Sequence, residues 1–151
     1  MFDYDFSGCI VENWNDLSSV GLAASSEWDS NYAVNNIKGS TTNPWHGRGM
    51  GSAWISFKFE KAVRISGFRY RNPSGWDGSS FKNFRFEHQT NNGWESFHEG
   101  QGPNLDCCAW QEIRLNTSPL ADSFRLFMLD DWGYGWLAIQ ELQLRTVEDC
   151  V

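Results

Sequence analysis

Short segments that alternate apolar and polar residues constrain the fold of this chain more than any other feature. Alternation places every second side chain on one face of a β-strand, so each segment can bury one face and expose the other. Turn clusters rich in glycine and asparagine separate these segments, and only residues 30–37 have a helical pattern. We therefore predict an all-β, single-domain antiparallel jelly-roll sandwich. The predicted strands are residues 54–60, 63–71, 84–88, 110–115, 123–129 and 137–145.

The 151 residues fit one domain, which we place at residues 1–151. No internal repeat or linker interrupts it, and a chain of this length buries about 68–70% of its unfolded surface. One irregularity is expected, because the apolar alternation of residues 63–71 breaks at Gly67. Such a break indicates a β-bulge.

The charge of the chain argues against two classes of partner. The sequence has 12 Lys and Arg residues against 19 Asp and Glu residues, a net charge of -7 and a pI near 4.8. Such a surface repels nucleic acid and anionic lipid, and no basic run overrides it. No apolar stretch approaches the roughly 18 residues of a membrane-spanning helix. We expect no nucleic-acid partner, and the acidic charge disfavours membrane contact.

The cysteines and the N-terminus bear on the compartment. Residues 1–6 lack the basic and apolar regions of a signal peptide, so the chain is either cytosolic or a mature secreted chain with an added methionine. Cys9 and Cys150 lie near the two ends, where compact domains often bring their termini together, and a bridge there would contribute roughly 4–5 kcal/mol. The adjacent Cys107 and Cys108 form a vicinal ring, stay reduced or pair with another molecule. We favour Cys9–Cys150 with Cys107–Cys108, and hence an extracellular or secreted protein; four reduced thiols in the cytosol are the alternative.

Catalytic motifs are missing from the sequence. It contains no nucleophile elbow, no His-Glu-x-x-His, no phosphate-binding loop and no Cys-x-x-Cys pair. The adjacent Asp130 and Asp131 are better explained as turn residues or hydroxyl acceptors than as the opposed acids of a glycosidase. We predict that the protein is not an enzyme.

Loops that combine indole, imidazole and guanidinium groups indicate recognition of a sugar. Indoles stack on the C–H face of a sugar ring, while His and Arg bond its hydroxyls. The loop at residues 45–53 carries a Trp-His pair, and other loops carry further aromatic rings beside polar groups. We expect Trp136 to belong to the core, with Trp54, Trp94 and Trp110 packing on strands. The candidate sugar ligands are His46, Arg48, Arg71, Asn72, Trp76, Asp77, Trp132 and Tyr134.

Residues from about 24 to 145 resemble the discoidin, or coagulation factor 5/8 type C, domain. The matching pieces are Ala33-Val34-Asn35-Asn36, Trp45-His46, residues 54–59, residues 65–70, Asn91-Asn92-Gly93-Trp94 and residues 138–144. The resemblance implies a galactose-binding-like jelly roll. The Trp-His pair is closer to the family 32 carbohydrate-binding modules than to the lipid-binding branch. Many such domains also join their termini by a disulfide, as predicted for Cys9 and Cys150.

The resemblance further implies residue roles. In the sugar-binding branch the His after Trp bonds a hydroxyl, which points to His46, but the aromatic expected three residues later is Gly49 here. The family holds a structural calcium ion with a Glu, here Glu141, and an Asp that is replaced by Asn35. Thr42 and Asn43 are the other candidate oxygen ligands. Because the charge of this set is reduced, we expect calcium to bind weakly or not at all.

These observations predict a non-catalytic, lectin-like domain that binds galactose-type or related sugars on glycans. Single sites of this kind bind weakly, so useful avidity requires several copies or a homo-oligomer. The alternative is an adhesion module of the same fold that binds phospholipid membranes or proteins through exposed Trp76 and Trp132.

Overall fold

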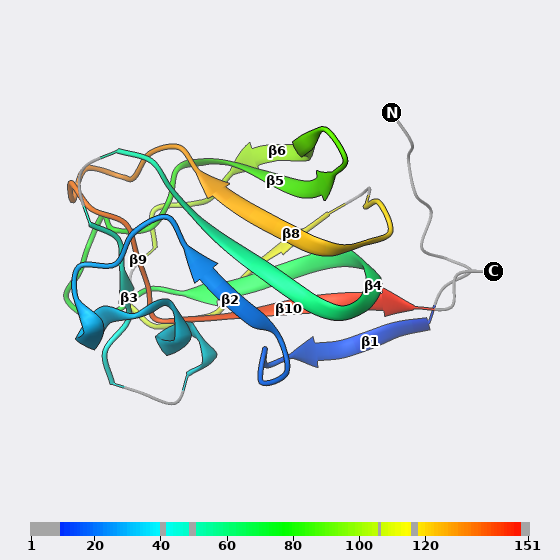
Figure 1. Ribbon diagram of the computed structural model, residues 1–151. Coiled ribbons are helices and arrows are strands. Elements are labelled where there is room, and N and C mark those ends of the chain that lie inside the picture. The colour runs from blue at the N-terminus through cyan, green and yellow to red at the C-terminus, as the bar shows by residue number, and fades with distance from the viewer. Residues whose placement is uncertain (1–9, 40–41, 49–50, 106, 116–117, 149–151) are drawn as a thin grey trace.

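The computed structural model describes residues 10–39, 42–48, 51–105, 107–115 and 118–148, with the backbone alone at residues 10–13 and 148. Two antiparallel sheets pack face to face (Figure 1). The first sheet contains β1 (Ile10–Asn15), β10 (Glu141–Glu148), the second half of β4 and β7 (Gln111–Arg114). The second sheet contains β2 (Gly21–Ala24), the first half of β4, β8 (Ala121–Met128), β5 (Asn83–Thr90) and β6 (Gly93–Gln101).

Strand β4 (Ala53–Arg71) belongs to both sheets. Its first residues pair with β2 and β8, and its last residues pair with β10 and β7. The predicted strands 54–60 and 63–71 are therefore one continuous strand, with exposed residues where it passes between the sheets. The register between β4 and β10 shifts between Gly67 and Ile65, which confirms the predicted bulge.

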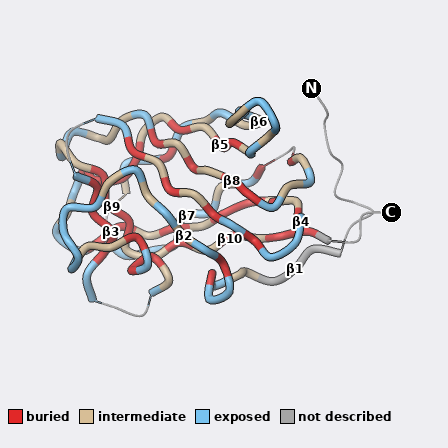
Figure 2. Tube along the Cα trace, in the orientation of Figure 1, coloured by how far each residue is buried: buried red, intermediate tan, exposed pale blue. Residues whose placement is uncertain are grey.

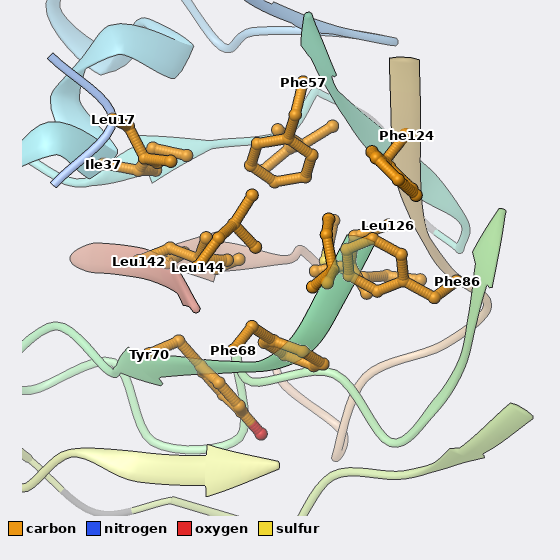
Figure 3. Packing of buried hydrophobic residues seen from close by; sticks show 14 of the residues in the cluster. Leu17, Ile37, Phe57, Phe68, Tyr70, Phe86, Phe124, Leu126, Leu142 and Leu144 are labelled. Carbon is orange, nitrogen blue, oxygen red and sulfur yellow. The ribbon is translucent and has the colours of Figure 1, made fainter. Parts of the chain in front are cut away.

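The core lies between the two sheets. Inward-facing aromatic and aliphatic side chains from both layers meet there, as Figure 3 shows for Phe57, Phe68 and Phe86. These three rings are fully buried, and burying a side chain of this size stabilises the fold by about 1.5–3 kcal/mol. The alternating burial of β4, β5 and β8 is the period-two pattern that the sequence predicts.

The helix-like segment forms two short 3₁₀ helices rather than an α-helix. They are η2 (Ser30–Tyr32) and η3 (Val34–Lys38), and the second ends at Gly39 with a φ of 88°. No helix in the described part of the chain is long and apolar enough to cross a membrane. Strands β1, β2 and β6 and the short strand at residues 45–46 were not predicted.

A small two-stranded sheet closes one end of the sandwich. It pairs β3 (Trp45–His46) with β9 (Ala138–Ile139), at the left of Figure 1 and opposite the end where β1 begins. Figure 2 shows buried residues here as well as between the large sheets. At the other end Ile10 and Glu148 are register partners. Cys9 and Cys150 lie outside the described residues, so their bridge stays a prediction.

Candidate functional site

Six rings gather at the end of the sandwich that carries β3 and β9. Every ring lies within about 6 Å of at least one other, measured between centroids. They come from four segments that are far apart in the sequence. We call this group the aromatic cluster; it consists of Trp28, Tyr32, His46, Trp76, Tyr134 and Trp136.

His46 lies at the centre of the aromatic cluster. Its ring centroid is 5.0 Å from that of Trp76, in an edge-on geometry with an interplanar angle of 89°. The centroids of Trp28 and Tyr32 are 5.2 and 5.7 Å away, and that of Trp136 is 6.0 Å away. The imidazole therefore touches four of the other five rings.

The His46 side chain is buried without hydrogen-bond partners. The residue is only 7% exposed, and neither ring nitrogen is bonded to any residue that the structure describes. Burial lowers the pKa of His46, an effect that the charge of Asp29 partly opposes. At neutral pH the ring is therefore neutral, with one nitrogen as donor and the other as acceptor. An unpaired buried polar group costs about 1–3 kcal/mol, so both nitrogens favour a hydrogen-bonding partner from solvent or from a ligand.

Backbone hydrogen bonds fix the position of His46. Its carbonyl accepts a bond of 2.8 Å from the Trp28 amide, and the Gly47 amide donates to Leu137 O at 2.9 Å. The preceding Trp45 is fully buried, and its indole N–H donates to Ser26 O at 3.0 Å. The imidazole is thus held on strand β3, while its neighbours in the aromatic cluster come from loops and, for Tyr32, from η2.

The loop that carries Trp76 is braced from within by Asn72. The Asn72 amide donates to Trp76 O at 3.1 Å and its oxygen accepts from Ser79 Oγ at 3.0 Å. Asn72 is 1% exposed, so this predicted sugar ligand is a buried support of the loop. Asp77, beside Trp76, is exposed.

The loop that carries Tyr134 and Trp136 is clasped to the Trp76 loop at Gly78. The amides of Trp132 and Tyr134 donate to Gly78 O at 3.0 and 3.4 Å. Asp131 accepts from the amides of Gly133 and Gly135, which confirms its predicted role as a turn residue. The clasp brings the rings of Trp76 and Tyr134 into a stack, with centroids 5.8 Å apart and planes 22° apart. We call this pair the outer layer of the aromatic cluster: Trp76 contacts the His46 ring, and Tyr134 is exposed.

Trp132 does not join the aromatic cluster. Its indole N–H donates to Gly102 O at 3.1 Å, and the Lys82 ammonium lies 5.0 Å from its ring centroid. Of the predicted sugar ligands the structure therefore brings His46, Trp76 and Tyr134 together and directs Trp132 elsewhere.

Of the two predicted arginines, Arg71 is paired with Glu141 and Arg48 is exposed. The Arg71 guanidinium donates to Glu141 and packs 5.1 Å from the ring centroid of Trp110. It lines a hollow of about 300 Å³ at the same end of the sandwich. Arg48 is exposed, and its backbone amide and carbonyl are both bonded to the Ser26 hydroxyl. The hollow is lined by Thr42, Arg71, Asn72, Ser74, Cys108 and Gln140.

The predicted calcium ligands are engaged with other protein groups. Glu141 faces Arg71, and Asn35 is exposed. The Asn36 amide nitrogen donates to Asn31 O at 2.8 Å and to Pro44 O at 3.2 Å, so amide protons rather than a cation satisfy these carbonyls. Among the described residues, no group of three His, Cys, Asp or Glu residues is placed to hold a metal. As arranged, this set does not fit a calcium ion.

The other two ligands predicted there are also exposed. They are Thr42, whose carbonyl accepts from Gln140, and Asn43, whose amide nitrogen donates to Asn31 O at 3.2 Å. Glu141 pairs with Arg71 in this arrangement, and the expectation that calcium binds weakly or not at all stays a prediction.

Cys107 and Cys108 lie side by side with their sulfur atoms in contact, and Cys108 borders the hollow beside Arg71. A disulfide between them stays a prediction.

Three rings of the aromatic cluster were not predicted as site residues. Trp136 was assigned to the core, which is wrong, because it is only partly buried and contacts His46. Trp28 is 45% exposed and stands in the polar stretch at residues 25–30, which is an unusual setting for an indole and the signal that could have identified it. Tyr32 gave no such signal, because its place over His46 depends on the η2 turn.

Comparisons with known proteins agree with this fold. The sequence matches the family model described as F5/8 type C domain over residues 15–142, and no curated protein matches it. The family 32 module of NanJ from Clostridium perfringens, solved with galactose, has 14% identity and a TM-score of 0.74 over 90% of this chain and 99% of its own. Another Clostridium perfringens family 32 module, solved with GalNAc-β-1,3-galactose, has 16% identity and a TM-score of 0.73 over 87% and 99%. A chitosan-binding module from Paenibacillus sp. IK-5 has 13% identity and a TM-score of 0.66 over 86% and 97%. At these identities the likeness shows a shared fold.

Proposed function

Because the chain belongs to the F5/8 type C domain family, we propose that it is a non-catalytic carbohydrate-binding module that holds a galactose-type or related sugar at the aromatic cluster. The observation that carries this proposal is His46, a buried imidazole with two unpaired nitrogens surrounded by aromatic rings. The sugars bound by similarly folded modules, galactose and GalNAc-β-1,3-galactose, support the ligand class.

The chemistry of the aromatic cluster suits a neutral sugar. A neutral imidazole donates to one hydroxyl and accepts from another, which would satisfy both nitrogens at once. Indole faces offer apolar area for the C–H face of a sugar ring. The aromatic cluster offers few charged groups that could balance the charge of an ionic ligand. Among the described residues, Asp29 is the only charged group shown to shift the pKa of His46.

Binding requires the outer layer of the aromatic cluster to move. Trp76 and Tyr134 lie on loops, whereas His46 is fixed on β3, so the two loop rings are the parts that can open. We propose that the Trp76–Tyr134 pair swings outward to admit the sugar and that Trp76 then stacks on its C–H face. Opening exchanges ring contacts for sugar contacts, which keeps the affinity of a single site modest.

A glycan array followed by calorimetry tests the proposal. Wild-type protein should bind a subset of galactose-type glycans, and Trp76→Ala should lose at least tenfold in affinity. Trp132→Ala removes an equally large ring that lies outside the aromatic cluster, on the loop that carries Tyr134, and should bind nearly as wild type. Absence of binding to every glycan at millimolar ligand would contradict the proposal.

We also propose an extracellular setting. Glycans are abundant there, and a bond between Cys107 and Cys108 persists in an oxidising compartment.

A further inference from the structure

A continuous stack of indoles and guanidiniums covers the outer face of the first sheet. The Arg145 guanidinium lies 4.2 Å from the ring centroid of Trp14, and that ring lies 4.7 Å from the Arg69 guanidinium. Arg69 in turn lies 4.4 Å from the Trp110 centroid, which is 5.1 Å from Arg71. We call these five residues the Trp–Arg stack. The three arginines alternate along β4 and β10 with the buried Phe68, Tyr70, Leu142 and Leu144, so they point away from the core.

Arginine is concentrated around the Trp–Arg stack although the whole chain is acidic. Arg145 and Arg114 are both register partners of Gly67, which has no side chain to separate them. Arg69 lies between Gln143 and Glu112, and Arg71 is opposite Glu141. The described side chains on this part of the face therefore include four arginines and two glutamates. Against a net charge of -7 for the chain, this face carries a local excess of positive charge.

The orientation of these groups determines which chemical groups of a ligand can bind to them. The Trp14 and Trp110 rings both pack against the Arg69 guanidinium, which leaves its N–H edge for a partner. Its Nε and Nη2 donate to Gln143, at 2.9 and 2.6 Å, which fixes the guanidinium plane, so Nη1 is the nitrogen that remains for a ligand. The two oxygens of a carboxylate can bond the edge of a guanidinium in its own plane. A sugar ring cannot stack on these indoles, because the arginines already pack against them.

The Trp–Arg stack ends at the hollow that Arg71 lines. Beside Arg71 the hollow is lined by Thr42 and Ser74, whose hydroxyl groups suit the uncharged hydroxyls of a sugar. A ligand that spans both regions needs carboxylates along the stack and hydroxyls in the hollow. We infer that the outer face of the first sheet is a second binding site, for an oligosaccharide that contains uronic acids. This site is separate from the aromatic cluster and does not depend on it.

Calorimetry at low salt with an oligogalacturonate hexasaccharide tests this site. Its methyl ester, with the same sugars but no charge, should bind at least tenfold more weakly. Arg145→Gln should weaken binding of the acid form about tenfold, as loss of one charge-assisted hydrogen bond predicts. Arg69→Lys, which keeps the charge but loses the planar fork, should weaken it to a similar degree.

Two controls keep the test specific. Lys58→Gln removes the same charge from the other sheet, where Lys58 pairs with Asp122, and should leave the affinity within twofold of wild type. Trp76→Ala should also leave it unchanged, which separates this site from the aromatic cluster. Thermal unfolding confirms that each variant is folded. Equal binding of acid and ester, or no effect of Arg145→Gln, would overturn the inference, and equally tight binding of a hexaglutamate peptide would show that the partner is not a glycan.

Discussion

The unpaired imidazole of His46 lowers the stability of the fold, and in the proposed function it serves sugar binding. A ring with two unpaired nitrogens in a cluster of indoles is an unfavourable way to fill space, and phenylalanine would fill it without polar atoms. A protein that retains such a group gains something other than stability from it. In the proposed function that gain is the pair of hydrogen bonds to sugar hydroxyls.

We predict that His46→Phe stabilises the fold and removes sugar binding. Urea unfolding should show a gain of about 1–2 kcal/mol, because the penalty of an unpaired buried polar group is lost. Calorimetry should show no sugar binding. His98→Phe is the matched control, since His98 stacks on Phe84 outside the aromatic cluster and its replacement should leave binding intact. A destabilised His46→Phe variant that still binds sugar would contradict this account.

The sequence identified some site residues at this scale and missed others. His46, Trp76 and Tyr134 stood out because ring chemistry in glycine-rich loops is unusual. Trp132 has the same kind of ring and Asn72 a hydrogen-bonding amide in similar loops, yet Asn72 braces its own loop and Trp132 bonds to Gly102. Which way a loop side chain turns depends on contacts between loops that are distant in sequence, and residue type alone does not encode it.

Among the elements, the loops around Gly78 determine the form of the aromatic cluster. Gly78 has a φ of 86°, and an added Cβ would lie 3.2 Å from the Tyr134 amide nitrogen and 3.3 Å from Trp132 O. Gly75 has a similar φ of 80° but faces open space. The two glycines therefore carry the same backbone strain on substitution, and they differ only in the contact between loops.

We predict that Gly78→Ala weakens sugar binding more than Gly75→Ala does. Both changes should cost about 1–2 kcal/mol of stability, because each forces a left-handed conformation on alanine. Only Gly78→Ala pushes the Tyr134 loop away from Trp76, so its sugar affinity should fall several-fold further. Calorimetry on both variants, with thermal unfolding beside it, measures the difference. Equal losses of affinity would show that the clasp has no part in binding.

The candidate calcium ligands lie near Asn35, near Asn43 and at the start of β10. With Glu141 on Arg71 and the Asn36 amide on two carbonyls, we predict that EDTA leaves sugar affinity and melting temperature unchanged. Arg71→Ala frees the carboxylate of Glu141 and should, if anything, introduce stabilisation by millimolar calcium. A fall in the melting temperature of wild-type protein on chelation would contradict this prediction.

Strands were predictable where one face is buried and not elsewhere. The alternation of β4, β5 and β8 follows from packing on the core, and the prediction succeeded there. Strand β6 lies at a sheet edge with mostly intermediate and exposed residues, so its sequence carries little alternation. The sequence also did not reveal that β4 continues through its exposed middle residues, because the polar residues there resemble a turn.

For the molecule as a whole, protonation of the histidines opposes folding. Burial lowers the pKa of His46, His88 and His98 below the ordinary value of 6.5. Between the folded and unfolded pKa values the unfolded chain binds more protons, so stability rises with pH in this window. The lowered pKa values of Asp16 and Asp122 act in the same direction, but only near and below pH 4.

We predict that the free energy of unfolding is constant from pH 8 to about 7 and decreases as the pH falls toward 5. The histidine contribution should then level off once the pH is below the folded pKa values. Urea titrations at several pH values measure this profile, and His46→Phe should flatten part of it. Stability that increases on acidification from pH 8 to 5 would show that the histidines are not buried in their neutral form.

In the proposed site, His46 binds the hydroxyls of a sugar among the surrounding aromatic side chains. Calorimetric titration of wild-type and His46→Phe protein with GalNAc-β-1,3-galactose is the decisive experiment. Wild type should show saturable millimolar or tighter binding, and the more stable variant should show none. Identical titrations for the two proteins, with or without binding, would contradict it.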